Sequence, residues 1–297
     1  MATLGVFIER GGSDDFLSFP DRRTPDQNDW PEHDGLEVDL SDLSFDAKKV
    51  TVNYVMTAND ETTFKSNLNA FEKLHFAPGC RSVFVKEFNR RFILRFTGFG
   101  NYLHKGGLYM RAKKIGKIAT EYVMDDPLQF FTSAIHTPIT TRTVLSQITL
   151  NDIDLSRFGI VVRDIYSTAL QLRSAKPVLE RKITDAVPKH QARQIAIECS
   201  MLANSVLEFM TNWTALFNNI CTTSAIQLGI TRTGAMIQCY YSKMTNFKKE
   251  TTFSRTIRVS FTLILQEVTL VQLLRLLASQ FGGLIVTEEN SCIELIY

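Results

Sequence analysis

The chain has 297 residues, and 44% of them are apolar, which is enough to bury a sizeable core in two domains, with or without a small appendage. No apolar run reaches the roughly 18 residues of a membrane-spanning helix, and the start of the chain lacks a basic leader followed by an apolar core. The sequence therefore predicts no membrane span and no signal peptide. We expect a protein that is made and assembled in a cytoplasm-like milieu.

The net charge is only +2, but its distribution along the chain is uneven. Residues 1–46 carry 12 acids and 3 bases, whereas residues 47–124 carry 14 bases and 5 acids. One interpretation is two solvated surfaces of opposite charge. The other is that the acidic arm, residues 11–46, lies across a basic face of its own or a neighbouring copy. We expect the arm to cross to a neighbouring copy, with contacts that salt weakens.

The chain begins with TLGVFIER, which is typical of a short edge strand, and continues into a long segment rich in Pro, Gly and Asp. Loops this long in a compact domain are usually functional or disordered. Phe16, Phe19 and Trp30 argue against plain disorder, because solvated linkers seldom carry three large aromatic side chains. We expect this segment to dock on another surface.

Residues 47–126 and 192–268 show the same order of predicted elements. A shift of about 145 positions aligns them without a gap through the first strand and helix. The matched residues are Val50, Val52, Met56, Ala58, Asn59 and Phe64 with Ile195, Ile197, Met201, Ala203, Asn204 and Phe209. After the helix the match loosens, although both copies continue with an apolar hairpin and an alternating strand. The sequence predicts a duplicated unit of one strand, one helix and further strands.

Each predicted helix has a cap and one apolar stripe. Asn59 or Asp60 caps the first helix, and Ser205 with Glu208 has the spacing of a capping box in the second. Such one-sided helices bury their stripes against sheets, so we expect Phe64 and Phe209 to be buried in equivalent places. The stripes are Phe64, Leu68, Phe71 and Leu74, and Val206, Phe209, Trp213, Leu216 and Ile220.

After each helix the pattern predicts antiparallel hairpins. The first turns at Asn89 and Arg90 and its counterpart turns near Gly234, while residues 105–107 turn the chain into the closing strand of the first unit. The first hairpin interleaves basic residues with phenylalanines, as protein surfaces that bind single-stranded nucleic acid do. The even spacing of the phenylalanines instead favours a packed hairpin, with the aromatic rings buried on one face and the bases on the other. These residues are Lys86, Arg90, Arg91 and Arg95, and Phe84, Phe88, Phe92 and Phe96.

The two units are joined by a predicted linker at about residues 126–142. Asn151 and Asp152 indicate a tight turn between two strands that open the second domain. Beyond residue 268 the sequence predicts an apolar helix that ends at Gly282 and Gly283, followed by a terminal hairpin. We expect this tail to cap the core or to form an assembly surface.

The sequence contains no motif of an enzyme, a phosphate-binding loop or a metal site. The crowded acids of the arm lack the ligand pattern of a calcium loop. We expect dispersed surface or loop histidines, and buried reduced cysteines without a disulfide framework. We predict no catalytic, cofactor-binding or metal-binding residue, although a site built from distant residues would leave no local trace. The residues are His33, His75, His104, His136 and His190, and Cys80, Cys199, Cys221, Cys239 and Cys292.

The predicted elements of a unit follow one another in a fixed order. An opening hairpin of the LNDIDLSRFGIVV type comes first, and then a long arm-like loop, a strand, one helix and hairpins that end near MDDP. This order resembles the tail-tube-like fold of phage distal tail proteins. The opening is best matched in residues 150–268, whereas the first unit matches over residues 50–127 and lacks the LNDIDLS signature. The resemblance reaches about residue 267, and the apolar tail beyond it has no counterpart.

The resemblance implies a mainly β (α+β) protein with two tandem tail-tube-like domains, each an antiparallel β-sandwich or split barrel with one packed helix. We expect a first domain with its acidic arm at residues 1–142, a second at 143–267, and a C-terminal helix and β-hairpin at 268–297. Members of this family usually carry a single such domain.

The implied function is structural, with no catalytic residues and no cofactor. We expect a ring at the tail tip or baseplate of a phage or phage-like particle, connecting the tail tube to the distal hub. Its partners would be further copies of itself, as a pseudo-six-fold trimer or a hexamer, and the tail tube, hub or tape-measure protein. DNA could pass through the lumen without specific binding. The alternatives are a tail tube protein proper and a nucleic-acid-binding protein that uses residues 81–117.

Overall fold

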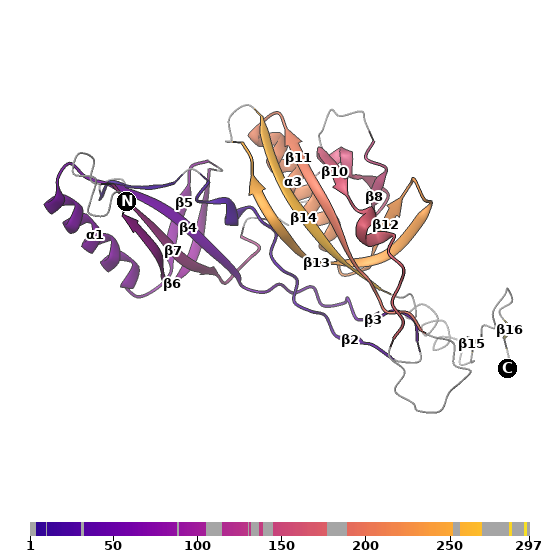
Figure 1. Ribbon diagram of the computed structural model, residues 1–297. Coiled ribbons are helices and arrows are strands. Elements are labelled where there is room, and N and C mark those ends of the chain that lie inside the picture. The colour runs from indigo at the N-terminus through magenta and orange to yellow at the C-terminus, as the bar shows by residue number, and fades with distance from the viewer. Residues whose placement is uncertain are drawn as a thin grey trace.

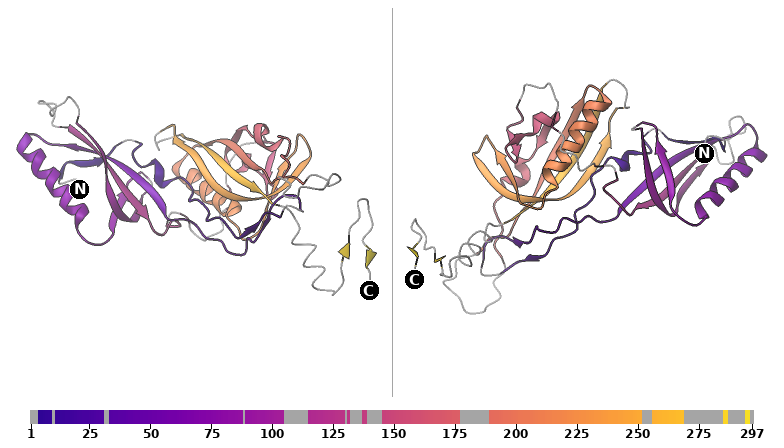
Figure 2. Two further views of the ribbon diagram at one scale, coloured as in Figure 1. Left: turned by 60° about the horizontal axis from the view of Figure 1, so that its bottom comes forward. Right: turned by 180° about the vertical axis from the view of Figure 1, so that it is seen from behind.

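The structure is a computed structural model that describes residues 4–9, 11–30, 33–87, 89–104, 115–129, 131, 137–138, 145–176, 189–251, 256–268, 285–286 and 294–295. The chain is mainly β and forms two curled antiparallel sheets, each a half-barrel accompanied by a helix (Figure 1). This arrangement confirms the predicted fold class. The two sheets lie side by side along the molecule, and residues 11–46 run between them (Figure 2).

The first unit holds a sheet in the order β1-β4-β7-β6-β5, in which every neighbouring pair is antiparallel. Helix α1 (Glu61–Phe76) connects β4 to β5. In β4 alternate side chains are buried, as the period-two pattern predicts. The strands are β1 (Val6–Ile8), β4 (Lys48–Thr57), β5 (Arg81–Val85), β6 (Arg90–His104) and β7 (Ile115–Met124).

The second unit holds a sheet in the order β10-β11-β14-β13-β12-β8-β9. Helix α3 (Val206–Ile220) connects β11 to β12, and two short helices, η3 (Leu155–Phe158) and α2 (Tyr166–Ala169), flank β10. The strands are β8 (Ile148–Leu150), β9 (Ile153–Asp154), β10 (Ile160–Asp164), β11 (Gln194–Ala203), β12 (Ile226–Ile230), β13 (Ala235–Lys249) and β14 (Ile257–Glu267).

The two units repeat one topology. The order β1-β4-β7-β6-β5 corresponds strand by strand to β10-β11-β14-β13-β12, with the helix in the same place. Strands β6 and β13 both have 15 residues, β5 and β12 both have 5, and both pairs lie 145 residues apart. The repeat therefore continues past the helix, where the sequence match had seemed to loosen. The second sheet is extended beyond β12 by β8 and β9, which have no counterpart among the described residues of the first unit.

The helices begin as predicted. Asp60 Oδ1 accepts a hydrogen bond from the backbone N–H of Thr63, and Ser205 Oγ accepts one from Glu208. Phe64 and Phe209 are both fully buried, which confirms their equivalent roles.

The end of the first apolar stripe was predicted wrongly. Leu74 is 48% exposed, and His75 occupies the buried position instead. A helix turns 100° per residue, so the stripe after Phe71 continues four residues on, and the polar His75 meets the sheet because Tyr122 offers it a hydrogen bond.

A glycine directly precedes β1 and its counterpart β10, and it plays the same part in both units. Gly5 and Gly159 have φ of +64° and +75°, and a Cβ at either would collide with the carbonyl oxygen of Thr57 or Leu202. Each glycine oxygen accepts a hydrogen bond of 2.9 Å from the backbone N–H of that same residue. Glycine is the residue that tolerates both the left-handed backbone and this close approach.

The other predicted turns and connections are in part confirmed and in part outside the described residues. Asn151 and Asp152 both have positive φ and join β8 to β9, as expected. In the tail, β15 (Ile285–Val286) pairs with β16 (Glu294–Leu295). The predicted turn at 105–107, most of the linker at 126–142 and the helix before Gly282 lie outside the described residues.

Candidate functional site: the arm between the two units

The arm, residues 11–46, leaves the first unit after β1, reaches the second unit and returns to β4 (Figure 1). It contains a short helix, η2 (Asp14–Phe16), and its outward and return legs pair through β2 (Gln27–Asn28) and β3 (Glu37–Val38). Further backbone bonds join Arg23 N to the Ser44 oxygen and Asp46 N to the Asp21 oxygen. The arm is thus a long, irregular hairpin.

The start of the arm carries aromatic side chains into a core shared by both units. Phe16 packs on Phe92 of the first unit at 4.4 Å between ring centroids, and Phe19 packs on Trp213 of the second unit at 4.4 Å. Phe16 is fully buried and Phe19 is 2% exposed, and both belong to one continuous apolar cluster. Burying each ring removes on the order of 150–250 Å² of surface from water. The predicted docking of this segment is confirmed for these two residues.

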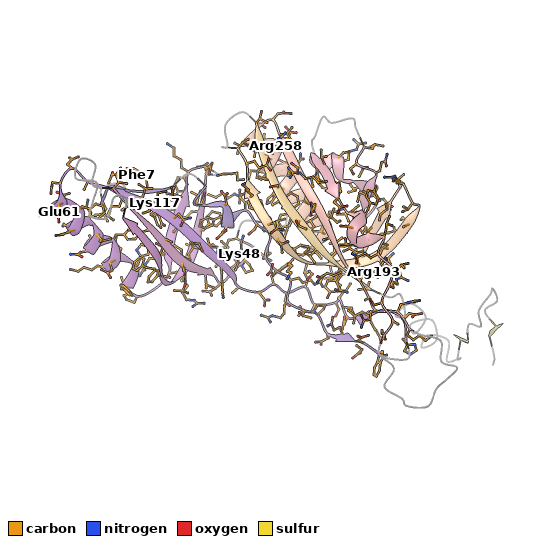
Figure 3. The ribbon with its side chains drawn as sticks, in the orientation of Figure 1. Phe7, Lys48, Glu61, Lys117, Arg193 and Arg258 are labelled. Carbon is orange, nitrogen blue, oxygen red and sulfur yellow. The ribbon has the colours of Figure 1, made fainter. Side chains whose placement is uncertain are left out.

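Hydrogen bonds to the arm's backbone fix its path. Trp213 Nε1 donates to the Leu17 oxygen at 2.9 Å, and Tyr241 Oη donates to the Pro20 oxygen at 3.1 Å. On the first unit, Lys48 Nζ donates to the Phe16 and Ser18 oxygens. Figure 3 shows Lys48 between the two units. Burial against the arm lowers the pKa of Lys48 to about 7.

Arg22 ties both legs of the arm to the second unit. Its guanidinium donates to the backbone oxygens of Thr222, Leu40 and Asp42, and it lies over the Tyr240 ring at 5.5 Å. Arg22 is only 5% exposed, and burial lowers its pKa. The planar fork of donors suits this role, because one side chain satisfies three carbonyl groups.

A buried ion cluster joins all three parts of the molecule. Lys249 Nζ, at the end of β13, lies 3.4 Å from Asp14 Oδ1 of the arm and 2.7 Å from Glu87 Oε2 of the first unit. The Lys249 side chain is 3% exposed. Burial raises the pKa of Asp14, and the lysine opposes that rise. Removing one partner of such a buried cluster leaves an uncompensated charge.

The tip of the arm hooks onto the connection between β10 and β11, residues 165–193, which we call the second arm because it holds the arm's place in the second unit. Gly35 N donates to the His190 oxygen at 2.8 Å, and Asp34 Oδ1 accepts from His190 N at 2.6 Å. Lys176 Nζ donates to the Trp30 and Gly35 oxygens at 2.8 and 2.7 Å. Trp30 itself stays 43% exposed.

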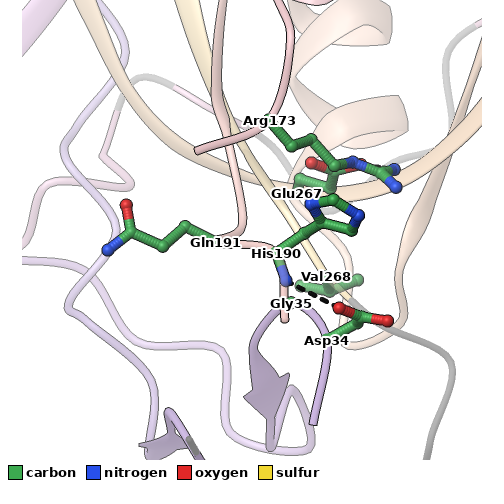
Figure 4. Close-up of a pocket in the computed structure, with 7 residues that line it drawn as sticks. All are labelled: Asp34, Gly35, Arg173, His190, Gln191, Glu267 and Val268. Carbon is green, nitrogen blue, oxygen red and sulfur yellow. Dashed lines mark hydrogen bonds and ion pairs between the residues drawn. The ribbon is translucent and has the colours of Figure 1, made fainter. Parts of the chain in front are cut away.

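A small pocket of about 70 Å³ lies beside this hook (Figure 4). Across it, Arg173 donates to Glu267 Oε1 at 2.6 Å, and Arg193 holds Glu267 Oε2 at 3.0 Å. Burial alone would raise the pKa of Glu267, but the two arginines bring it below its ordinary value. The volume equals that of about two waters, so the pocket suits an ion-pair latch rather than an organic ligand.

The expectation that the arm crosses to a basic surface on a neighbouring copy is wrong for the contacts described. The arm docks on the second unit of its own chain, through buried aromatic rings and backbone hydrogen bonds more than through surface charge. Charge counting could not reveal this, because it does not register the burial of Phe16 and Phe19.

The structure places several of the histidines and cysteines that the sequence analysis considered. Among the described residues, no group of three or more His, Cys, Asp or Glu side chains is placed to hold a metal ion. Cys199 and Cys239 are buried thiols, as predicted, and burial raises the pKa of both. Cys80 is exposed, so the prediction of a buried thiol is wrong for that residue. His75 is not a surface histidine, since its Nε2 lies 2.6 Å from Tyr122 Oη in the core. No helix in the described ranges is long and apolar enough to cross a membrane.

The basic hairpin of the first unit differs from its prediction. Val83 and Val85 of β5 face the core with Phe92, whereas Phe84 is 49% exposed and pairs across the strands with Arg91. The prediction extended one alternating pattern of buried and exposed residues from β5 through the turn after Val85 into β6. Residues of the turn do not keep the alternation of a strand, so the even spacing does not place all the phenylalanines on one face. The side chain of Phe88 lies outside the described residues.

No protein-family model matches this chain, and no curated protein matches it. Among solved structures it is similar to the crystal structure of SPP1 Dit (gp 19.1), described as a paradigm of the hub adsorption apparatus in phages that infect Gram-positive hosts. The two chains are 10% identical, the match covers 90% of this chain and 95% of that chain, and the TM-score is 0.32.

Proposed function

We propose that this protein is a structural component of a phage or phage-like tail, which forms a ring at the tail tip or baseplate and connects the tail tube to the distal hub. One observation carries the proposal: the chain holds two copies of one sheet-and-helix unit, and the arm of the first copy docks on the second. This is a head-to-tail contact, the type that closes into rings when it is repeated with a constant rotation.

The second arm extends the argument from one chain to a ring. It leaves the second unit at the place where the arm leaves the first, between β10 and β11. If the second arm meets the first unit of the next copy as the arm meets the second unit, the contact repeats around an axis. The order of elements also resembles the tail-tube-like unit of distal tail proteins.

The proposal extends to organisation and location. Residues 1–142 and 143–267 would act as two ring-forming domains, with residues 268–297 as an appendage. The ring would belong to the virion tail, assemble in the host cytoplasm and contact the tail tube, hub or tape-measure protein. It would have no catalytic role and no cofactor, and a tail tube protein proper is the nearest alternative.

Negative-stain electron microscopy of the purified protein tests this function. We expect closed rings with an open lumen. Monodisperse single chains at micromolar concentration, with no ring, would contradict the proposal.

A nucleic-acid-binding role for residues 81–117 is the second candidate, favoured by the exposed Phe84 beside Arg91. Binding to short single strands that weakens steeply with salt, and is lost in Phe84→Ser, would support it. The same titration with Ile93→Ser, which removes another exposed apolar side chain of this hairpin, is the control.

A further inference from the structure

An apolar groove runs along the open seam of the first half-barrel. It lies between β1 and β5, the two edge strands, and has a volume of about 720 Å³. Phe7 and Phe84 on its borders are 53% and 49% exposed. Figure 3 labels Phe7 on this unit. The groove is lined by Val6, Phe7, Ile8, Glu9, Ser13, Tyr54, Ser82, Val83, Phe84, Val85, Lys86 and Glu87.

The second unit shows what fills the equivalent seam. There β8 pairs with β12, with Leu150 opposite Leu228 and Ile148 opposite Ile230. Ile148 and Leu150 are 1% and 0% exposed. The equivalents of Leu228 and Ile230, 145 positions earlier, are Val83 and Val85 of β5. Within the described residues, β5 has no strand on this side.

The strand that fills the second seam comes from the chain just after the first unit. β8 begins 24 residues after the end of β7. The chain also continues after the second unit, and Ile293 stands 26 residues beyond the end of β14. In the one case described, the connection after the first unit supplies the strand for the second, and the chain after the second unit is long enough to supply another.

The tail repeats the sequence of the filling strand. Residues 146–150 read Ser-Gln-Ile-Thr-Leu and residues 291–295 read Ser-Cys-Ile-Glu-Leu, with the same separation of 145 that relates the two units. In the structure Glu294 and Leu295 form β16, whose described pairing is with β15 alone. A two-stranded hairpin is at best marginally stable by itself, so addition to a sheet would stabilise it.

We propose that residues 291–295 of one copy add as an antiparallel strand to β5 of the next copy and fill the seam of its first unit. This rests on the proposed head-to-tail function, because the next unit after the second belongs to another copy. In Figures 1 and 2, β15 and β16 lie at the opposite end of the molecule from β1 and β5, so the segment meets the seam of another copy and not its own.

The register of the second unit defines the contacts. Leu295 lies opposite Val83 and Ile293 opposite Val85, with their side chains in the groove. Glu294 lies opposite Phe84, on the outer face where Lys86 and Arg91 are exposed. An acidic residue in the added strand thus meets two bases on the edge that receives it.

A disulfide tests this register between copies. In the second unit Thr231 N donates to the Gln147 oxygen at 2.9 Å, and the equivalent pair in the proposed contact is Lys86 with the natural Cys292. Opposed residues of an antiparallel pair have the Cα separation that a disulfide needs, about 5.5 Å. Lys86→Cys is made together with Cys80→Ser, because Cys80 is exposed. Tagged and untagged copies are then mixed, oxidised mildly and separated on a non-reducing gel.

We expect disulfide-linked species that contain both tagged and untagged chains, and their loss when Cys292→Ser is added. Absence of linked chains, or a link within one chain only, overturns the inference. Rings without the link would leave the proposed function standing and remove this inference alone. A link between copies that form no rings would support the strand addition and contradict the ring.

A second pair of variants does not depend on the new cysteine. Ile293→Asp places a carboxylate in the groove, whereas Glu294→Asp keeps a carboxylate on the outer face of the same strand. We expect at least a tenfold rise in the concentration needed for assembly with Ile293→Asp and little change with Glu294→Asp. Equal effects of the two substitutions would contradict the proposed face.

Discussion

Phe64 and Phe209 occupy the same place in the two units, fully buried between helix and sheet. Replacing either with Ala should lower the free energy of unfolding by about 3–5 kcal/mol, the usual range for truncating a core phenylalanine. Urea unfolding followed by circular dichroism measures the change. Phe76→Ala is the control, because Phe76 is 67% exposed. A loss under about 1 kcal/mol at Phe64 or Phe209 would show that the helix does not pack as described.

His75 is a buried polar side chain at a position of α1 whose equivalent in α3 is apolar. Its Nδ1 lies 2.8 Å from the Phe71 oxygen and its Nε2 contacts Tyr122 Oη, whereas Ile220 stands at the equivalent place in α3. Burial lowers the pKa of His75. In the unfolded chain His75 therefore binds a proton near pH 6.5, whereas in the folded chain it binds that proton only at lower pH. The free energy of unfolding consequently falls as the pH drops below about 6.5.

We expect His75→Gln to remove this part of the pH dependence. The wild-type free energy of unfolding should fall more steeply from pH 7 to 5 than that of the variant, by at most about 1.4 kcal/mol per pH unit for one proton. Urea titrations at several pH values measure both slopes. Parallel slopes would mean that His75 is protonated equally in the folded and unfolded chains.

For single residues, the sequence predicted burial correctly where the spacing of apolar residues alone determines which side chains are buried. Phe64, Phe209 and the alternating residues of β4 follow from period and composition. His75 and Phe84 were misplaced, because a buried hydrogen bond in one case and a turn in the other set their positions. Both depend on atoms distant in the sequence or on local backbone geometry, neither of which a hydropathy pattern contains.

Among the elements, the arm depends on its aromatic anchors. Phe19→Ala should detach the start of the arm, because Phe19 contacts the rings of Trp213 and Phe217 at 4.4 and 5.1 Å. We expect faster proteolysis within residues 11–46 and a red shift of the Trp213 emission as water reaches its ring. The arm of the wild type should resist 0.5 M salt, since apolar burial is not screened.

The matched control for the arm is Trp30→Phe, which removes the other, exposed tryptophan and leaves Trp213 as the single reporter. If 0.5 M salt shifted the Trp213 emission of this variant as much as Phe19→Ala does, charge and not apolar burial would hold the arm in place.

The helices and strands themselves were largely predictable from the sequence, whereas the tertiary contacts between them were not. Both helices, their caps and the repeat could be inferred, and the structure extends the repeat through β6 and β13. The docking of the arm arises from pairs such as Leu17 with Trp213, which lie 196 positions apart. A single sequence contains no signal for such pairs.

For the whole molecule, the duplication bears on the number of chains in a ring. Three chains with two units each can reproduce the contacts of six single units, and each chain makes half of those contacts internally, which lowers the entropy lost on association. We therefore expect a trimer with pseudo-six-fold symmetry. Light scattering should give three times 33.7 kDa. A mass of six times that value would indicate a hexamer, with twelve units in two layers.

The two units are connected by one covalent stretch, from β7 to β8, and by the docked arm, both ends of which belong to the first unit (Figure 1). A pull along the molecule would therefore be shared between that connection and the arm, and to detach the arm it must extract Phe19 and Arg22 from their contacts with Trp213 and Tyr240. Two domains held by the connection alone would separate at the first small force. This chain should instead bear tension as one body, a property suited to a part that transmits mechanical load.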